Sequence, residues 1–424
     1  MIALLDANNF FVSCERVFRP DLMKRPVAVL SNNDGCIISR SNEVKVLGVP
    51  MGAPYFKYKD ILTDHNVAIF SSHFTLYGDM SGRMMNLIDS LAPRMEVYSI
   101  DEAFIDLSGM KDKDIEVLCN RVRDILWRSL GIPTSIGISK TKTLAKVANH
   151  YAKRVPAFKS ICFLKEDHRI EHALKRLSVG DVWGIGRQIT KKLEGQGILT
   201  AYDLKNVDPR CMRQSFSVVG ERIVRELNGV PCLELEDIAD PKKSIQVTRS
   251  FSKTITELDE LKSTIATYAT RLGQKLREQG VMTKNIMVCI RTSKFRRRDP
   301  QYANSYTISL PSFIQDDISL IKTAMQALAQ IYRPGFAYAK AGIMALDLAP
   351  KGQDVQLDLF SRNLQEPFQV EKLWEAVDSV NKQYGRGTLF SAACGRSLNW
   401  KDQKNHLSPP YTTNWNYLPV AFAK

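Results

Sequence analysis

The chain has 424 residues, of which 44% are hydrophobic and 25% charged, so a wholly disordered or fibrous protein is excluded. At roughly 150 residues per domain, this length predicts about three domains. Lysine and arginine number 59 against 45 acidic residues, and the resulting net charge of +14 favours a polyanionic partner or a membrane surface.

Predicted strands and helices alternate over about the first 165 residues. Short apolar runs predict strands at 2–5, 27–30, 97–100, 103–107 and 133–139. Helical spacing predicts helices at 9–18, 80–91, 114–130 and 143–153. Residues 31–59 are rich in turn-forming, polar and basic side chains. This alternation predicts an α/β domain with a sheet core.

The pattern changes after residue 170. Residues 170–230 predict short helices joined by glycine turns, and the acidic, proline-bracketed segment 231–241 predicts a linker. Strands and helices are then predicted at 244–251, 258–279, 286–291, 305–310, 318–332 and 337–348. That order is β-α-β-β-α-β, a split βαβ arrangement. Beyond residue 350 the chain is polar, and we expect an irregular tail without a core of its own.

The eight cysteines are scattered, and no two have CxxC spacing. This favours reduced thiols over a disulfide framework or a structural zinc site. Residues 1–5 are apolar, but Asp6 interrupts them and no basic segment precedes them, so a signal peptide is not predicted. No stretch approaches the ~20 apolar residues of a membrane span. We therefore expect a cytoplasmic protein with no membrane partner.

Three carboxylates are candidates for a metal site. Asp6 ends the first predicted strand, and Asp101 and Glu102 lie at the tip of a predicted hairpin. Carboxylates that converge from strand ends can bind Mg²⁺, and two such ions can activate a 3′ hydroxyl and neutralise a triphosphate. Alternatively, Asp6 caps a helix and the other two residues only form a turn. Their shared place in one basic α/β domain favours the metal site.

Two motifs give this chain a family resemblance. Residues 5–15 (LDANNFFVSCE) and 98–104 (YSIDEAF) resemble the catalytic motifs of Y-family translesion DNA polymerases, and the whole chain resembles their UmuC group. The resemblance implies an α/β and α+β multidomain protein shaped as a right hand. The implied parts are a palm at 1–25 and 77–167, fingers at 26–76, a helix-hairpin-helix thumb at 168–233, a linker at 234–243, a β-α-β-β-α-β little finger at 244–350 and a tail at 351–424.

The resemblance also implies roles for single residues. Asp6, Asp101 and Glu102 match the catalytic carboxylates, which bind two Mg²⁺ ions together with the Ala7 carbonyl. Phe11 matches the steric gate, the ring that excludes a ribose 2′-OH. The implied nucleotide-binding residues are Phe10, Lys45 and Lys153. The family has Tyr and Arg where this chain has Asn42 and Lys45, so Lys45 keeps the charge without the bidentate fork.

Several features predict contact with primer–template DNA. Gly184 and Gly186 precede a predicted helix and would let backbone N–H groups approach a phosphate, although a helix cap explains them equally well. A second glycine turn near 219–221 favours helix-hairpin-helix. Residues 241–300 carry 14 lysines and arginines against five acidic residues. We predict that they form a DNA-tracking sheet face, the alternative for 296–298 being a solvated loop. The residues predicted to bind DNA there are Arg249, Arg291, Lys294, Arg296 and Arg297.

The tail contains a candidate partner motif. Its residues are Gln356, Leu357, Asp358, Leu359 and Phe360, which resemble the peptide that binds bacterial sliding clamps. Apolar anchors on an exposed tail suit a hydrophobic pocket, although they could also pack on their own chain. Residues beyond 384 resemble the UmuC group, which implies contacts with a UmuD′-like dimer and with RecA.

Together with these observations, the resemblance implies an error-prone translesion DNA polymerase subunit of the SOS response, which transfers dNTPs in a template-directed, two-metal reaction. One alternative is a non-catalytic DNA-bound scaffold that recruits the sliding clamp. A scaffold has no need of three converging carboxylates. A nucleotide cyclase is another alternative, but a cyclase does not need a thumb, a second basic module or a clamp peptide.

Overall fold

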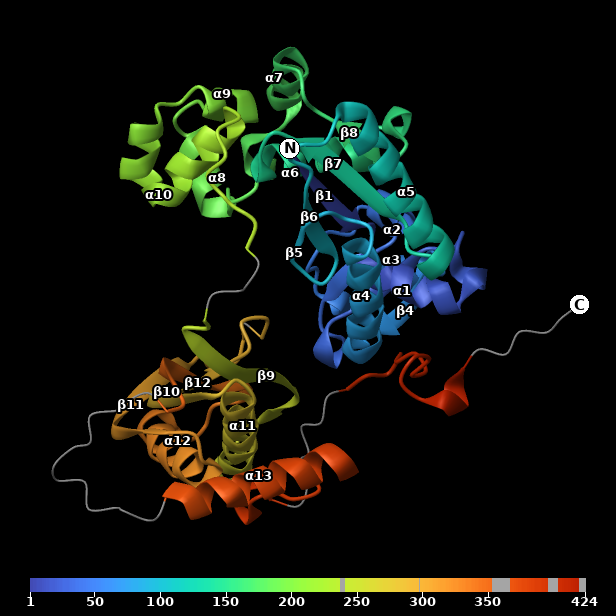
Figure 1. Ribbon diagram of the computed structural model, residues 1–424. Helices are drawn as coiled ribbons and strands as arrows, with labels where there is room; N and C mark the ends of the chain where they lie inside the picture. The colour runs from blue at the N-terminus through green and yellow to red at the C-terminus, as the bar shows by residue number, and fades with distance from the viewer. Residues whose placement is uncertain (237–240, 297, 353–366, 396–402, 419–424) are drawn as a thin grey trace, which may run out of the picture. The chain divides into compact units, whose positions relative to one another are not determined.

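The computed structural model describes residues 1–236, 241–296, 298–352, 367–395 and 403–418. The chain forms two compact units (Figure 1). The first comprises Met1–Ala239 together with Lys404–Lys424, and the second comprises Asp240–Gln403. No helix in the described ranges is long and apolar enough to cross a membrane.

A five-stranded sheet forms the centre of the first unit, in the order β5-β6-β1-β7-β8. Its strands are β1 (Ile2–Ala7), β5 (Met95–Val97), β6 (Glu102–Asp106), β7 (Thr134–Ser139) and β8 (Ile161–Phe163). The helices packed on it are α1 (Phe10–Phe18), α4 (Phe74–Asp89), α5 (Asp112–Leu130) and α6 (Lys142–Arg154). Leu5 packs with α1, α4 and α5, whereas Leu4 packs against Ala145 of α6. Both faces are therefore covered, which explains why β1 is an unbroken apolar run.

A smaller sheet with its own core lies between β1 and α4 in the sequence. Its order is β3-β2-β4, with β2 and β4 parallel. Its elements are β2 (Val27–Leu30), β3 (Ile37–Arg40), α2 (Asn42–Val46), α3 (Tyr55–Asp64) and β4 (Ala68–Ser71). Only β2 was predicted. β3 has two apolar residues followed by two polar ones, so its burial alternates without an apolar–polar alternation that would identify a strand.

Four helices without strands follow β8, as predicted. They are α7 (Asp167–Arg176), α8 (Arg187–Glu194), α9 (Ala201–Lys205) and α10 (Pro209–Leu227). The prediction of a glycine turn at 219–221 is wrong in position. The backbone of α10 breaks at Phe216 and Ser217, and Ser217 has a φ of 67°, whereas Gly220 is helical and packs against Met212.

The second unit has the predicted β-α-β-β-α-β order. Its elements are β9 (Ser244–Ile255), α11 (Leu258–Glu278), β10 (Val281–Thr292), β11 (Ala303–Ile314), α12 (Asp317–Ile331) and β12 (Tyr338–Pro350). The sheet is antiparallel throughout, in the order β11-β10-β12-β9, and α11 and α12 pack on it in a single core. The strands are longer than predicted because polar side chains on the open face interrupt the apolar pattern.

The tail is more regular than expected. Helix α13 (Pro367–Tyr384) packs on α11, where Arg277 forms ion pairs with Asp378 at 2.7 Å and Asp317 at 2.8 Å. The same guanidinium lies 5.2 Å from the ring centre of Trp374. Cys394 completes the core of the second unit. Residues 356–360 lie outside the described residues.

Candidate active site

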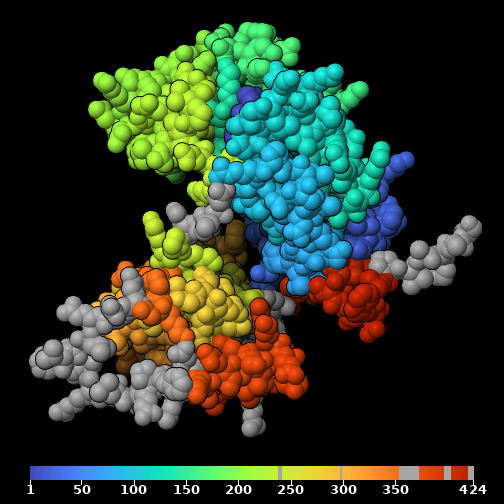
Figure 2. Space-filling view, viewed as in Figure 1, coloured from blue at the N-terminus to red at the C-terminus, as the bar shows by residue number. Residues whose placement is uncertain are grey.

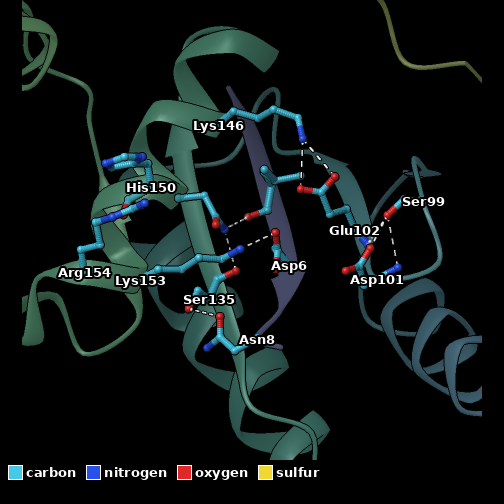
Figure 3. A network of polar contacts seen from close by, with 12 residues as sticks. Asp6, Asn8, Ser99, Asp101, Glu102, Ser135, Lys146, His150, Lys153 and Arg154 are labelled. Atoms are coloured by element: carbon cyan, nitrogen blue, oxygen red, sulfur yellow. Dashed lines mark hydrogen bonds and ion pairs between the residues drawn. The ribbon is translucent and has the colours of Figure 1, made fainter. Parts of the chain in front are cut away.

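The three predicted carboxylates come together at one end of β1 and β6 (Figure 3). Asp6 is directly opposite Glu102 in the antiparallel register of these strands. Asp101 lies in the turn that precedes β6, and its carbonyl accepts the N–H of Ala7 at 2.9 Å. The backbone pairing therefore places Asp6, Ala7, Asp101 and Glu102 side by side.

Ser99 fixes the turn that carries Asp101. Its hydroxyl donates to the Asp101 carboxylate at 2.6 Å and accepts the N–H groups of Asp101 and Glu102 at 3.2 and 3.1 Å. The strand predicted at 97–100 instead ends at Val97, because these hydrogen bonds hold the following residues in a turn. Ser99 belongs to the recognised motif, but we did not predict a role for it.

Helix α6 supplies two lysines to the carboxylates. Lys146 and Lys153 are seven residues apart, or about two helical turns, and therefore share a face. Lys153 Nζ lies 2.5 Å from Asp6, and Lys146 Nζ lies 3.0 Å from both carboxylate oxygens of Glu102. The ammonium of Lys146 also lies 4.6 Å from the ring centre of Tyr98. We predicted Lys153 but missed Lys146, although the seven-residue spacing would have identified it.

Burial makes these charges costly. Asp6 is only 8% exposed, and its pKa is raised to about 7, mainly by desolvation and further by the nearby charge of Glu102, while Lys153 lowers it. Among the described residues, no three acidic, histidine or cysteine side chains form a group that could hold a metal ion. Lys146 and Lys153 form ion pairs with Glu102 and Asp6 instead.

The donor set nevertheless fits a divalent cation in its chemistry. Carboxylate oxygens and a backbone carbonyl are the hard ligands that Mg²⁺ takes. The charge of Glu102 contributes to the raised pKa of Asp6, so a cation between the two carboxylates would relieve that repulsion. A cation would have to replace the ammonium groups of Lys146 and Lys153.

A second group of cations lies beside the carboxylates. Lys45 is on the exposed side of α2, and its Nζ donates to Asn42 at 3.3 Å. The pKa of Lys45 is lowered by desolvation and then by the charges of Arg40, Lys153 and Arg154. We did not predict Arg40 or Arg154. Mutual repulsion of this kind marks a surface that attracts a polyanion.

The two adjacent phenylalanines have different surroundings. Phe10 is 3% exposed and packs in the core, so the structure does not present its ring to a nucleotide. Phe11 is half-buried, and its ring stacks on Tyr77 with centroids 4.6 Å apart and planes 18° apart. The hydroxyl of Tyr77 donates to the buried carboxylate of Glu15 at 2.6 Å. We had not predicted a role for Glu15 or Tyr77.

The two glycines before α8 have separate roles. Gly184 has a φ of +88°, and a Cβ there would lie 2.8 Å from Ile223, so this glycine permits close packing against α10. Gly186 is the N-cap of α8 and has open space around it, with no side chain capping the helix. Only Gly186 therefore leaves backbone N–H groups accessible to a phosphate.

The basic residues that we predicted on one face of the sheet lie on different sides of it. Arg249 lies on the same side of β9 as Ile245 and Val247, which is the side covered by α11. The pKa of Lys275 in α11 is lowered mainly by desolvation, then by the charge of Lys242, and then by the charge of Arg249. Arg291 is exposed and, by its register opposite Lys340, lies on the open face. Lys294 and Arg296 are exposed in the segment after β10, and Arg297 lies outside the described residues.

A cavity of about 1060 Å³ lies elsewhere in the first unit, lined by residues that include Glu96, Lys142, Arg222 and Cys232. The predicted linker forms part of its wall, because Lys142 Nζ donates to the Glu234 carbonyl at 2.6 Å and the N–H of Glu236 donates to Glu96 at 2.9 Å. None of the predicted catalytic residues lines it, so the cavity is separate from the carboxylate site.

Comparison with known proteins identifies the family. Residues 5–150 match the impB/mucB/samB family, and residues 242–359 match the C-terminal domain of that family. The chain belongs to the impB/mucB/samB family. Residues 371–421 match a domain of unknown function. The family assignment confirms the resemblance inferred from residues 5–15 and 98–104.

Individual relatives cover nearly the whole chain. It is 42% identical to protein UmuC of Salmonella typhimurium over 420 residues, which are 99% of each chain, and 41% identical to MucB of Escherichia coli over the full length of both. DNA polymerase IV 1 of Bacillus subtilis is 26% identical over 92% of each chain. A solved chimeric Y-family DNA polymerase matches with a TM-score of 0.68 and 18% identity, over 83% of this chain and 100% of the other. The predicted fold class is thereby confirmed.

The buried Glu15 predicts how stability depends on pH. Desolvation raises its pKa from 4.5 to about 7, against the opposing effect of the hydroxyl groups that donate to it. The folded chain then binds more protons than the unfolded chain between these values, so the free energy of unfolding should fall as the pH rises through this window. In the Glu15→Gln variant, this fall in the free energy of unfolding should be smaller by up to about 3 kcal/mol.

Urea unfolding of both chains at about pH 5 and about pH 7.5 measures the difference. Glu116→Gln, at an exposed position of α5, is the matched control. Some slope should remain in every variant, because the pKa of Asp6 is also raised. An identical slope with and without Glu15 would show that this carboxyl does not titrate in the window.

Proposed function

We propose that this chain is an error-prone translesion DNA polymerase, which transfers nucleotides to a primer under the direction of a damaged template. The observation that carries the proposal is the register that sets Asp6 opposite Glu102, with Asp101 in the adjoining turn. Relatives named DNA polymerase IV and a solved Y-family polymerase of the same fold support it. These comparisons give no support to a non-catalytic scaffold.

Asp6, Asp101, Glu102 and the Ala7 carbonyl would hold two Mg²⁺ ions. When bound, such ions neutralise the triphosphate and lower the pKa of the primer 3′ hydroxyl. Lysine side chains of the protein provide the remaining contacts with the incoming nucleotide. Lys153 leaves its ion pair with Asp6 and binds a phosphate oxygen of the incoming dNTP. Lys45 approaches the same triphosphate from α2. Phe11, supported by Tyr77, excludes a 2′-OH.

Primer–template DNA binds through phosphates rather than bases. The open N-terminus of α8 at Gly186 and the exposed side chains of Arg291, Lys294 and Arg296 suit such contacts. Residues 356–360 bind the sliding clamp, and the C-terminal region binds a UmuD′-like dimer and RecA during the SOS response. The similarity to UmuC over 99% of both chains supports the UmuD′-like partner, whereas the clamp and RecA are proposed from the sequence motifs alone.

Asp101→Asn should reduce nucleotide incorporation by about a thousandfold or more, because a neutral amide cannot supply the charge that several kcal/mol of transition-state stabilisation requires. DNA binding should remain nearly unchanged. Single-turnover primer extension and DNA titration measure the two effects. Asp114→Asn, at an exposed position of α5, is the control. Normal turnover by Asp101→Asn would refute the catalytic assignment.

Phe11→Ala should relax discrimination against ribonucleotides without destroying the carboxylate site, because the ring acts by sterics. The measurement is the ratio of kcat/KM for a dNTP to that for the matching ribonucleotide. Phe56→Ala, which removes an exposed ring of α3, is the control. If an active Phe11→Ala enzyme keeps the ratio of the unmodified chain, the gate lies elsewhere.

Replacing Leu359 and Phe360 with Ala should weaken clamp binding by a few powers of ten. Each apolar side chain contributes ~1.5–3 kcal/mol on burial in a partner pocket, less the cost of ordering the tail. Basal extension of a short primer should survive, whereas clamp-stimulated synthesis should not.

The matched control replaces Leu389 and Phe390, which are exposed residues of the same two types. Unchanged clamp affinity would make the motif accidental. Loss of basal activity would instead mean that Leu359 and Phe360 pack against the rest of the chain.

A further inference from the structure

The end of the chain is part of the first unit. Ser71, at the end of β4, donates its N–H to the His406 carbonyl at 2.9 Å, and the N–H of His406 donates to the Ser71 hydroxyl at 3.0 Å. Lys404 Nζ adds a bond of 3.1 Å to the Ser72 carbonyl. Figure 2 shows this segment in red against the blue atoms of the first unit. We call residues 404–418 the docked segment.

One side chain of the docked segment enters the protein interior. Ser408 is 5% exposed, and its hydroxyl donates to Glu15 Oε1 at 3.1 Å. The same hydroxyl lies 3.2 Å from Nδ1 of His73, which is also buried. Ser408 can donate to Glu15 and accept from His73 when Nδ1 carries the proton.

The carboxylate of Glu15 depends on these donors. Glu15 is fully buried, and both the Ser408 and the Tyr77 hydroxyl groups donate to the same oxygen, Oε1. The other oxygen, Oε2, has no hydrogen-bond partner among the described residues. A buried carboxylate with two donors on one oxygen loses a large share of its support when either donor is removed.

The supported carboxylate is directly linked to the Phe11 ring. Glu15 and Phe11 are one turn apart on α1, and the Tyr77 ring that is hydrogen-bonded to Glu15 is also stacked on Phe11. Three direct contacts therefore connect Ser408 of the tail to the Phe11 ring.

A second contact docks the same segment on the same helix. Tyr411 stacks on Phe18 with centroids 4.7 Å apart and planes 9° apart. Phe18 ends α1, one turn after Glu15. The docked segment therefore contacts α1 at two places, independently of its bonds to β4.

We infer that Ser408 is a positioning residue for sugar selection, which acts on the Phe11 ring through Glu15 and Tyr77. The inference rests on the proposed role of Phe11 as the steric gate. A gate that works by sterics discriminates only while its ring is held in place, because a small displacement opens room for an additional hydroxyl. The region that matches a domain of unknown function thus supplies a residue that supports the nucleotide site without being part of it.

Ser408→Ala tests the inference. It should lower the ratio of kcat/KM for a dNTP to that for the matching ribonucleotide by about three- to tenfold, the effect of one lost hydrogen bond. The kcat for the dNTP should change by less than about twofold, since the carboxylate site is untouched. Ser408→Thr keeps the hydroxyl and should restore the ratio, and Ser108→Ala, an exposed serine of the same unit, should leave it unchanged.

Tyr77→Phe provides a second variant that leaves the docked segment in place. It keeps the ring under Phe11 but removes the bond to Glu15, and it should reduce the ratio in the same way. In a Phe11→Ala background, Ser408→Ala should have no further effect, because the two residues act in one chain of contacts.

The outcomes separate the inference from the proposed function. If Phe11→Ala lowers the ratio but Ser408→Ala and Tyr77→Phe do not, the gate stands and the inference is overturned, even where Ser408→Ala lowers the melting temperature. Additive losses in the double variant would also overturn it. If Phe11→Ala itself leaves the ratio unchanged in an active enzyme, the gate assignment fails, and the inference fails with it.

Discussion

The antiparallel register of β1 and β6 is the constraint on which the site depends. It sets Asp6 beside Glu102, and a slip by one residue would turn one of them to the other face of the sheet. The two charges are made tolerable by lysines of α6, which must lie close to the sheet. Gly137 of β7 permits that approach, because a Cβ there would be 2.1 Å from the backbone nitrogen of Asn149. A residue without a side chain thus enables the electrostatics of the site.

The ammonium groups of Lys146 and Lys153 balance the carboxylates of Glu102 and Asp6. A buried carboxylate without a partner would be driven toward its neutral form, as the raised pKa of Asp6 shows even with Lys153 beside it. Lys153 opposes the rise in the pKa of Asp6, and Lys146 forms an ion pair with Glu102. The charges of Arg40, Lys153 and Arg154 all act on Lys45, so these four side chains form a single positive surface.

The sequence was sufficient wherever a pattern is local. The apolar run of β1, the helices that pack on the five-stranded sheet and the β-α-β-β-α-β order of the second unit could all be predicted, and so could the family motifs around Asp6 and Asp101, whereas α3 and α13 were missed. Features that depend on partners far away in the sequence could not be predicted. β4 pairs in parallel with β2, with Ala68 opposite Val27, and Arg249 and Arg291 fall on opposite faces because of a strand register that no local pattern records.

Glu15 shows the same limit most clearly. A glutamate in an amphipathic helix is expected on the solvent side, yet this one is fully buried because Tyr77, 62 residues away, and Ser408, 393 residues away, both donate to it. Burying a charged group is unfavourable unless it is hydrogen-bonded, so its position depends on the docked segment as much as on α1. Since α1 also carries Phe11, folding of the tail onto the first unit and placement of that ring depend on one another.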